Sequence, residues 1–273
     1  MAHVSRLLVY PVKSLDPHPV DAVEINNGAL RHDREYAIVD GDREVVNGKR
    51  EPKLHRLRSE YDHETRTLRL REHGDTDDSD DPDTPSDWHS FRMDADRGEL
   101  NAFLSHFLDY PVSVVRDASG GMPDDTTLDG PTVIASETLD AVAHWFDDID
   151  ADEICRRLRP NVVVTADEAF WEDRLYAHAD ERRKFTVGDV TMYGHNPCQR
   201  CAVPTRNPDT GEETPGFRER FVTKREETLP DWATTERFDH YFRLMVNTTI
   251  PESVWGETVA VGDEVSLGDV QSV

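Results

Sequence analysis

Short apolar or alternating stretches, separated by Pro, Gly, Asn and Asp, fill the first part of the chain. They lie at 4–10, 20–25, 35–39, 54–58 and 67–70. Runs of four to eight such residues bounded by turn residues are typical of β-strands. We therefore predict a β-rich N-terminal half.

Two other segments have apolar residues at the spacing of a helix. The spacing over 97–108 predicts an amphipathic helix packed on the sheet, and that over 136–146 predicts a second helix with Ser136 or a neighbour as its N-cap. Strand-like runs also occur at 111–115, 161–165, 184–193 and 258–267. The pattern as a whole indicates a β-rich α+β protein, and we find no internal repeat.

Two polar stretches interrupt these elements. Residues 73–87 contain almost no apolar side chain, so they cannot bury enough surface to offset the cost of ordering, and we expect a mobile surface loop. A calcium loop is the weaker alternative, because the central Gly and closing Glu of an EF-hand are missing. The turn-rich sequence SGGMPDDTTLDGP at 119–131 predicts a linker, which gives two domains, 1–118 and 119–273.

The net charge of the chain limits its possible ligands and the environment in which it works. Its 273 residues include 56 Asp and Glu against 31 Lys and Arg, for a net charge of -25. So little basic surface argues against binding of nucleic acid over the whole surface. Near 1 M salt the Debye length falls to about 3 Å, so the repulsion between these charges is screened. We therefore hypothesise that the protein works in the salt-rich cytoplasm of a halophile.

The lengths of the apolar runs and the number of cysteines exclude several classes of protein. The longest apolar runs, such as 7–12, are far shorter than the roughly 20 residues that span a bilayer, and the first residues read as a strand rather than a signal peptide. The 3 cysteines cannot supply a disulfide framework, an all-cysteine zinc site or a four-cysteine iron–sulfur cluster. We expect a soluble cytoplasmic protein with no membrane partner.

The strongest local motif is Cys198-Gln-Arg-Cys201, two thiols three residues apart with Arg200 between them. A cation at this position can stabilise a thiolate. Half of a zinc site is one interpretation, but two further ligands would be needed. A thioredoxin-like dithiol is another, which Pro204 and Pro208 disfavour because such motifs open a helix. Two cysteines packed under a loop are the third, and spacing alone does not decide among the three.

Basic residues form several short clusters in this otherwise acidic chain. One lies at 156–159, and others lie at 10–14, 30–34 and 47–52. Each cluster alone is typical of a solvated face. If the fold brings them together, they form a local positive pocket for an anionic group, because Arg and Lys are the side chains that bind phosphate.

Seven motifs then appear in order along nearly the whole chain. They are YPVKS at 10–14, GALRHDR at 28–34, REPKL at 50–54, SETL at 136–139, RLRPN at 157–161, CQRC at 198–201 with PDTG behind it, and VGDEV at 261–265. Together they resemble the MOSC family, in the branch that includes the mitochondrial amidoxime-reducing component and its bacterial relatives. The resemblance implies a MOSC N-terminal β-barrel domain over 1–118 and a MOSC domain over 119–273, both with barrel-like mixed sheets.

The resemblance also implies a site. It places a molybdenum cofactor (molybdopterin with Mo) between the two domains, with Cys201 as the metal ligand and Cys198 beside the site. For a catalytic proton donor, the sequence offers only two weak candidates, Asp209 and His195, and no ground for choosing between them. The positions that correspond to cofactor-binding residues are Lys13, Ser14, Arg34, Ser136, Arg159, Asn161, Arg200 and Thr205.

The implied activity is a two-electron reduction of small N-hydroxylated substrates. The chain lacks the ferredoxin domain of some relatives, so we expect a separate electron donor of ferredoxin, flavoprotein or cytochrome type. One departure from the pattern is Asn47-Gly-Lys-Arg50 where relatives have Thr-Ala-Arg-Gln, so Lys49 or Arg50 would supply that donor. The alternative function is a sulfur carrier or cofactor-handling module, as in cofactor sulfurases, whose pyridoxal-phosphate domain is not fused here.

Overall fold

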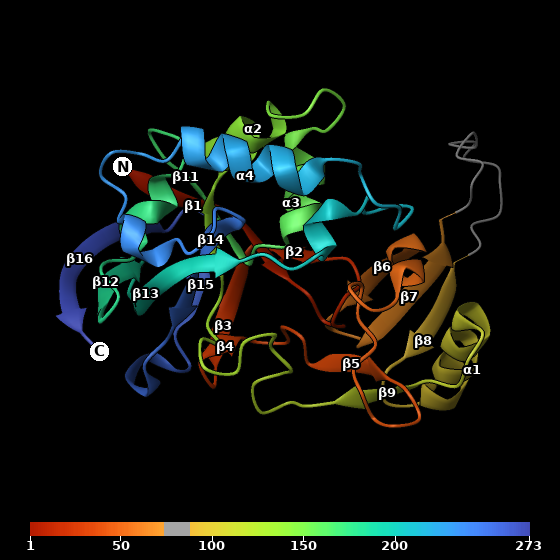
Figure 1. The fold of residues 1–273 in the computed structure, drawn as a ribbon. Helices are drawn as coiled ribbons and strands as arrows, with labels where there is room; N and C mark the ends of the chain where they lie inside the picture. The colour runs from red at the N-terminus through yellow and green to blue at the C-terminus, as the bar shows by residue number, and fades with distance from the viewer. Residues whose placement is uncertain (74–87) are drawn as a thin grey trace.

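The computed structural model describes residues 1–73 and 88–273. It contains two units packed side by side, a larger barrel that carries both chain termini and a smaller unit on the other side of Figure 1. The acidic loop expected at 73–87 lies, from residue 74 on, outside the described residues. The β-rich α+β class and the two-barrel arrangement predicted from the sequence are confirmed.

The larger barrel is one mixed sheet in the order β11-β10-β14-β13-β12-β16-β1-β2, which closes because β11 also pairs with β1. Closure removes the free strand edges that invite aggregation. The predicted strand at 184–193 is a hairpin that turns at Gly188, where φ is +55°. The strand bounds are β1 Ala2–Val9, β2 His18–Val20, β10 Val133–Ala135, β11 Val162–Thr165, β12 Glu181–Val187, β13 Val190–Gln199, β14 Arg243–Thr249 and β16 Glu264–Ser272.

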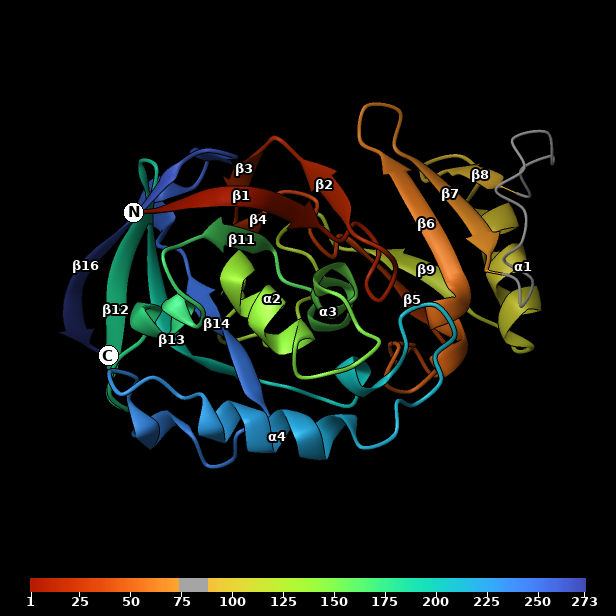
Figure 2. The ribbon, with the colours of Figure 1, turned by 90° about the horizontal axis from the view of Figure 1, so that it is seen from above.

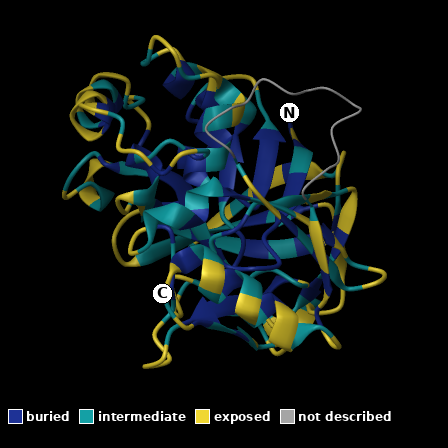
Figure 3. Ribbon diagram, turned by 90° about the vertical axis from the view of Figure 1, so that its right-hand side faces the viewer, coloured by how far each residue is buried: buried dark blue, intermediate teal, exposed yellow. Residues whose placement is uncertain are grey.

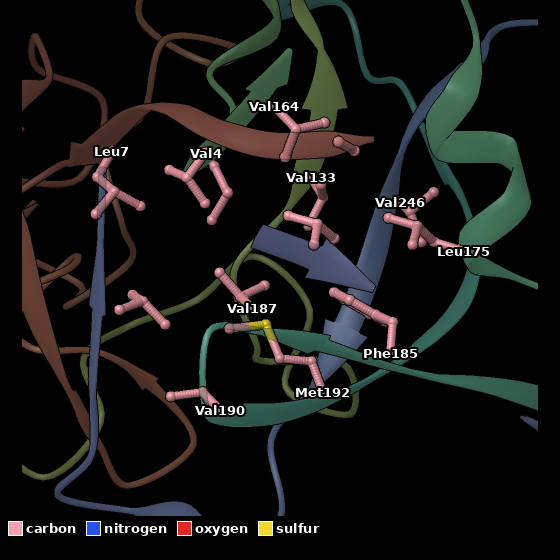
Figure 4. Packing of buried hydrophobic residues seen from close by; sticks show 14 of the residues in the cluster. Val4, Leu7, Val133, Val164, Leu175, Phe185, Val187, Val190, Met192 and Val246 are labelled. Atoms are coloured by element: carbon pink, nitrogen blue, oxygen red, sulfur yellow. The ribbon is translucent and has the colours of Figure 1, made fainter. Parts of the chain in front are cut away.

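The first strands of the chain belong to this larger barrel rather than to the smaller unit. β1 pairs with β11 and β16, and β3 (Ala22–Asn26) pairs with β4 (Ala29–Leu30) and with β15 (Thr258–Ala260). The barrel core therefore mixes side chains from both ends of the sequence, as the contact of Val4 and Leu7 with the later strands shows (Figure 4).

Three helices cover one side of the larger barrel: α2 (Ser136–Ala143), α3 (Ala151–Leu158) and α4 (Phe217–Glu227) (Figure 2). A second apolar cluster fills the space between them and the sheet. The sequence predicts α2 with Ser136 or a neighbour as its N-cap, but places its end three residues too late. Ser136 is instead the first helical residue, after Ala135, and no side chain caps this helix.

The smaller unit has its own core, drawn from residues between 12 and 114. The predicted helix at 97–108 is confirmed, and it buries Leu100, Leu104 and Leu108 against the sheets. The predicted strand at 54–58 is a 3-10 turn, η1, for most of its length, because Pro52 opens that turn. The elements of this unit are β5 Tyr36–Val39, η1 Pro52–Arg56, β6 Leu57–Asp62, β7 Thr67–Glu72, β8 His89–Arg92, α1 Arg97–Leu108 and β9 Ser113–Arg116.

Residues 118–130 connect the two units without forming a helix or strand. We call this segment the strap. Figure 3 shows how the buried parts of the sheets lie inside a shell of exposed turns. Within the described residues, no helix has the length and apolar character needed to cross a membrane. The remaining 3-10 turns are η2 Trp171–Leu175, η3 Val203–Thr205, η4 Thr235–Arg237 and η5 Glu252–Val254.

Candidate functional site

A cleft of about 590 Å³ lies between the two units and is lined by residues of both. Clefts of this size hold ligands as large as organic cofactors. The structure thus brings together basic segments that are far apart in the sequence. The cations that line the cleft are Lys13, Arg34, Lys49, Arg159 and Arg200.

Cys201 follows the end of β13 and is exposed in the cleft. Across the described part of the chain, its thiol makes no hydrogen bond. The turn that begins at the next residue is closed by a hydrogen bond from the Thr205 hydroxyl to the Ala202 carbonyl at 2.8 Å. An accessible, uncommitted sulfur is available to a metal that prefers soft ligands.

Arg200 contacts the other thiol of the motif. Its Nη1 lies 3.1 Å from Cys198 Sγ, and its Nη2 donates to the Leu158 carbonyl at 2.8 Å. Its backbone N–H donates to the Phe242 carbonyl, which ties the motif to the start of β14. The guanidinium therefore contacts Cys198 and the end of α3, whereas the sequence shows only that Arg200 lies between the two cysteines.

Arg159 stands at the end of α3 in the left-handed conformation, with φ of 59°. Its guanidinium lies 4.3 Å from the centroid of the Tyr10 ring and donates to the Leu15 carbonyl at 2.7 Å. Arg34 also lies over this ring, at 5.3 Å, and its guanidinium is ion-paired with Asp33. Burial, and then the charge of Arg34, lower the pKa of Arg159. Two guanidinium groups at one aromatic ring are a strong attraction for an anion.

Lys13 and Ser14 also line the cleft. Lys13 Nζ donates a hydrogen bond to the Met122 carbonyl of the strap at 3.0 Å. Ser14 Oγ accepts a hydrogen bond from the Gly48 N–H at 3.3 Å. Of the two donors that could replace the relatives' Arg, Lys49 lines the cleft. Arg50 is directed outward, where it pairs with Asp40 and Glu44.

Asn161 lines the cleft, but its side chain is engaged with backbone. Its Nδ2 donates to the Leu8 carbonyl at 3.1 Å, and its Oδ1 accepts from the Thr132 N–H at 3.3 Å. The residue is buried. It therefore joins β1 to the segment before β10, and so fixes the floor of the cleft.

Four residues named from the sequence lie outside the set that lines the cleft: Ser136, His195, Thr205 and Asp209. Ser136 Oγ donates to the Val164 carbonyl at 3.3 Å. The His195 ring is hydrogen-bonded to the Thr249 hydroxyl at 2.9 Å, and burial followed by the charge of Arg182 lowers its pKa. Thr205 shapes the Cys201 turn instead of facing the cleft.

Asp209 forms ion pairs that join the two units. Its carboxylate lies 2.7 Å from Arg156 of α3 and 2.9 Å from Arg58 of β6. Burial alone would raise the pKa of Asp209, but the hydrogen bond and charge of Arg156 outweigh this effect and hold the pKa low. A carboxylate that is ionised and doubly paired is a poor proton donor, so this geometry favours a structural role.

His55 is a lining residue that the sequence analysis missed. Its Nε2 donates to the Gly48 carbonyl at 3.2 Å, and burial lowers its pKa to about 4 although that hydrogen bond opposes the shift. A lone histidine in a polar turn gives no sequence signal. The acids of the cleft were missed for a similar reason, and these are Asp33, Asp124, Asp125 and Asp129.

Comparison with known proteins covers both units. Residues 1–111 match the MOSC N-terminal beta barrel domain, and residues 132–266 match the MOSC domain. The chain is 27% identical over 240 residues to mitochondrial amidoxime reducing component 2 of Bos taurus, in a match covering 76% of this chain and 67% of that protein. For mitochondrial amidoxime-reducing component 1 of Homo sapiens the identity is 24% over 236 residues, with the same coverage. A molybdenum cofactor sulfurase of Caenorhabditis briggsae is 26% identical over 78% of this chain, which spans 30% of that protein.

Proposed function

Because the chain belongs to the MOSC family through both of its domains, we propose that it is a molybdenum-cofactor-dependent reductase of small N-hydroxylated substrates. The two amidoxime-reducing relatives support the reaction class. The observation that carries the proposal is the position of Cys201, exposed in a cleft that also gathers the cations of both units.

The residues of the cleft fit a molybdenum cofactor on three counts. A soft thiol with no hydrogen-bond partner in the described chain is free to ligate a metal. Arg34 and Arg159 share one aromatic ring, and so present donors for a phosphate group. The Arg200 Nε is buried without a hydrogen-bond partner among the described residues, which leaves one more donor for a ligand.

Each group would have its own task. Cys201 would hold the metal, which when bound supplies the two-electron chemistry that cleaves the N–O bond. Arg34, Arg159 and Lys13 would bind the anionic end of the cofactor, and Lys49 lies where a further contact to it is possible. Arg200 would keep Cys198 and the end of α3 in position. Electrons would come from a separate donor protein.

A second candidate is a sulfur carrier or a module that handles the molybdenum cofactor. Two molybdenum cofactor sulfurases among the relatives favour it, although this chain spans only 30% and 29% of their lengths. In that case a cysteine of the motif would carry a persulfide, and no metal would be retained. The half-buried Cys198, in contact with a guanidinium, is the alternative carrier beside Cys201.

Substrate turnover separates the two candidates. Protein made in a host that synthesises molybdenum cofactor is assayed for reduction of benzamidoxime with reduced methyl viologen. We expect turnover in the parent chain and in Cys198→Ala, and none in Cys201→Ala. Persulfide on the purified chain without turnover would favour the sulfur carrier. Equal turnover in Cys201→Ala would rule out the proposed role of this thiol.

A further inference from the structure

The strap forms hydrogen bonds and an ion pair with Lys13, the lysine of the proposed anion site. Lys13 Nζ lies 3.0 Å from the Met122 carbonyl, 3.2 Å from the Pro123 carbonyl and 2.8 Å from Asp124 Oδ1. An ammonium has three N–H donors, so these three contacts use all of them. Lys13 therefore cannot bind a second anion in this arrangement unless the strap releases it.

The strap also approaches the backbone beside Arg34. The Met122 N–H donates to the Arg34 carbonyl at 2.9 Å. Gly121 has a φ of +74°, and a Cβ there would lie 2.3 Å from the Asp33 carbonyl oxygen. Only glycine permits this approach, since any side chain would meet backbone.

Asp124 lies where the cations of the cleft act together. The surrounding protein displaces some water from the Asp124 carboxylate, which would raise its pKa, but the charges of Arg34, Lys13 and Arg159 outweigh this effect and lower the pKa. The same three residues are those proposed to bind the anionic end of the cofactor. The Asp124 side chain is nevertheless 77% exposed, so its position depends on charge rather than on packing.

From this placement we propose that Asp124 is an internal anion that occupies the phosphate subsite of the cleft until a phosphate-bearing ligand displaces it. The inference rests on the proposed function for the assignment of the subsite. A phosphate carries a charge of about −1.5 to −2 at neutral pH and three acceptor oxygens, whereas a carboxylate carries −1. A phosphate group can therefore displace Asp124, whereas a monovalent anion such as chloride has no such advantage.

This arrangement would make the site selective. Without Asp124, Lys13, Arg34 and Arg159 would have, among the described residues, only the Asp33 carboxylate that pairs with Arg34 as an ion-pair partner, and the remaining positive charge would attract small anions of the medium. Asp124 lowers the positive charge of the pocket in the absence of its ligand and keeps Lys13 paired. The strap would then open only for a ligand that binds more strongly than its own carboxylate.

The test measures binding of inorganic phosphate to the full chain, made in a host without molybdenum cofactor, by calorimetry at constant ionic strength. Asp124→Asn removes the competing charge, and we expect phosphate to bind roughly tenfold more tightly, since a charge-assisted contact is lost from the competitor. Asp129→Asn is the matched control, because Asp129 lines the same cleft on the same strap but makes no described ion pair. It should change the affinity less than threefold.

Two further variants check the mechanism. In the Lys13→Gln background, Asp124→Asn should give a smaller gain, because the ion pair between Lys13 and Asp124 is already absent and only the charges of Arg34 and Arg159 still act on the carboxylate. Gly121→Ala, which lifts the strap by another route, should also tighten phosphate binding. Thermal unfolding of each variant shows whether it is folded.

An unchanged or weaker affinity in Asp124→Asn, or an equal gain in Asp129→Asn, would overturn the inference. So would a gain of undiminished size in the Lys13→Gln background. The proposed function is tested separately from this inference. If the chain shows the expected phosphate effects but never retains molybdenum, the inference about the strap stands and the proposed reductase function is rejected. If the chain retains molybdenum through Cys201 but Asp124→Asn leaves the phosphate affinity unchanged, only the inference about the strap is rejected.

Discussion

Arg58 of β6 and Asp209, which follows the Cys201 turn, form a 2.9 Å ion pair between the smaller unit and the larger barrel. Arg58 also donates to the Pro208 carbonyl at 2.7 Å and pairs with Asp16 at 2.8 Å. The loop that carries the cleft cysteine is thus anchored to the opposite wall. The width of the cleft depends on this contact as well as on the connecting strap.

We predict that Asp209→Asn lowers the free energy of unfolding by about 1 kcal/mol at pH 7, a value limited by the partial exposure of the pair. The pKa of Asp209 is lowered in the folded state, so its contribution is present above pH 3.8 and is lost as the pH falls through the folded pKa. Denaturant unfolding of parent and variant at several pH values measures this difference, with Asp148→Asn as an exposed control.

The same variant separates two roles for Asp209. As an interdomain contact, it should change stability and the KM of the loaded enzyme, and leave the pH dependence of kcat unchanged. If Asp209 were the proton donor, kcat would collapse without any loss of stability, which would contradict the structural role.

Glu172 lies fully buried beside the Asp173–Arg225 pair. Burial, and then the charge of Asp173, raise its pKa to about 8 from an ordinary value of 4.5. The folded state therefore keeps a proton that the unfolded state loses, and stability falls as the pH rises through this window. We predict that Glu172→Gln, which retains an acceptor for the Thr138 hydroxyl, stabilises the fold at pH 8 by on the order of 2 kcal/mol.

Denaturant titrations at pH 5 and pH 8 check this prediction. The gain should nearly vanish at pH 5, where Glu172 is protonated in the folded chain, and the exposed Glu252→Gln should show no gain at either pH. A stabilisation of equal size at both pH values would show that ionisation of Glu172 is not the cause.

The net charge of -25 predicts a strong response to salt. Raising KCl from 0.1 M to 1 M shortens the Debye length from about 10 Å to about 3 Å, so repulsion between exposed carboxylates weakens. The free energy of unfolding should rise over this range, and a titration with sucrose controls for general solvent effects. Stability that decreased steadily with added KCl would contradict the halophile hypothesis.

The three thiols differ in access, which alkylation can measure. Cys201 is exposed, Cys198 is half-buried, and Cys155, a residue of α3, is buried. Iodoacetamide followed by mass spectrometry should label Cys201 first, and Cys155 only when the chain unfolds. Cys201→Ser should remove the fastest phase. Early labelling of Cys155 would show that the helical layer is not packed as described.

How far the sequence predicts the fold depends on the element. The helix at 97–108 was found because its apolar residues repeat regularly, whereas α4 buries only Phe217, Phe221 and Arg225 among many charges and gives no apolar face to detect. The pairing of β1 with strands of the second half was not visible either, because a strand carries no record of its partner.

The candidate site likewise contains residues that the sequence predicts and contacts that it does not. Basic clusters and the family motifs led to Lys13, Arg34, Arg159 and Cys201, and these residues meet at one cleft. The contact of Lys13 with Asp124 crosses 111 positions of sequence and depends on how closely the strap approaches, so no local pattern reveals it. The pairing of Asp209 with Arg58 was hidden for the same reason.

The most direct test of the account is the molybdenum content of the chain purified from a host that makes the cofactor. We predict about one metal atom per chain in the parent and in Cys198→Ala, and nearly none in Cys201→Ala, with all three folded as judged by thermal unfolding. Metal retained at the parental level in Cys201→Ala, or absent from the parent made in such a host, would contradict it.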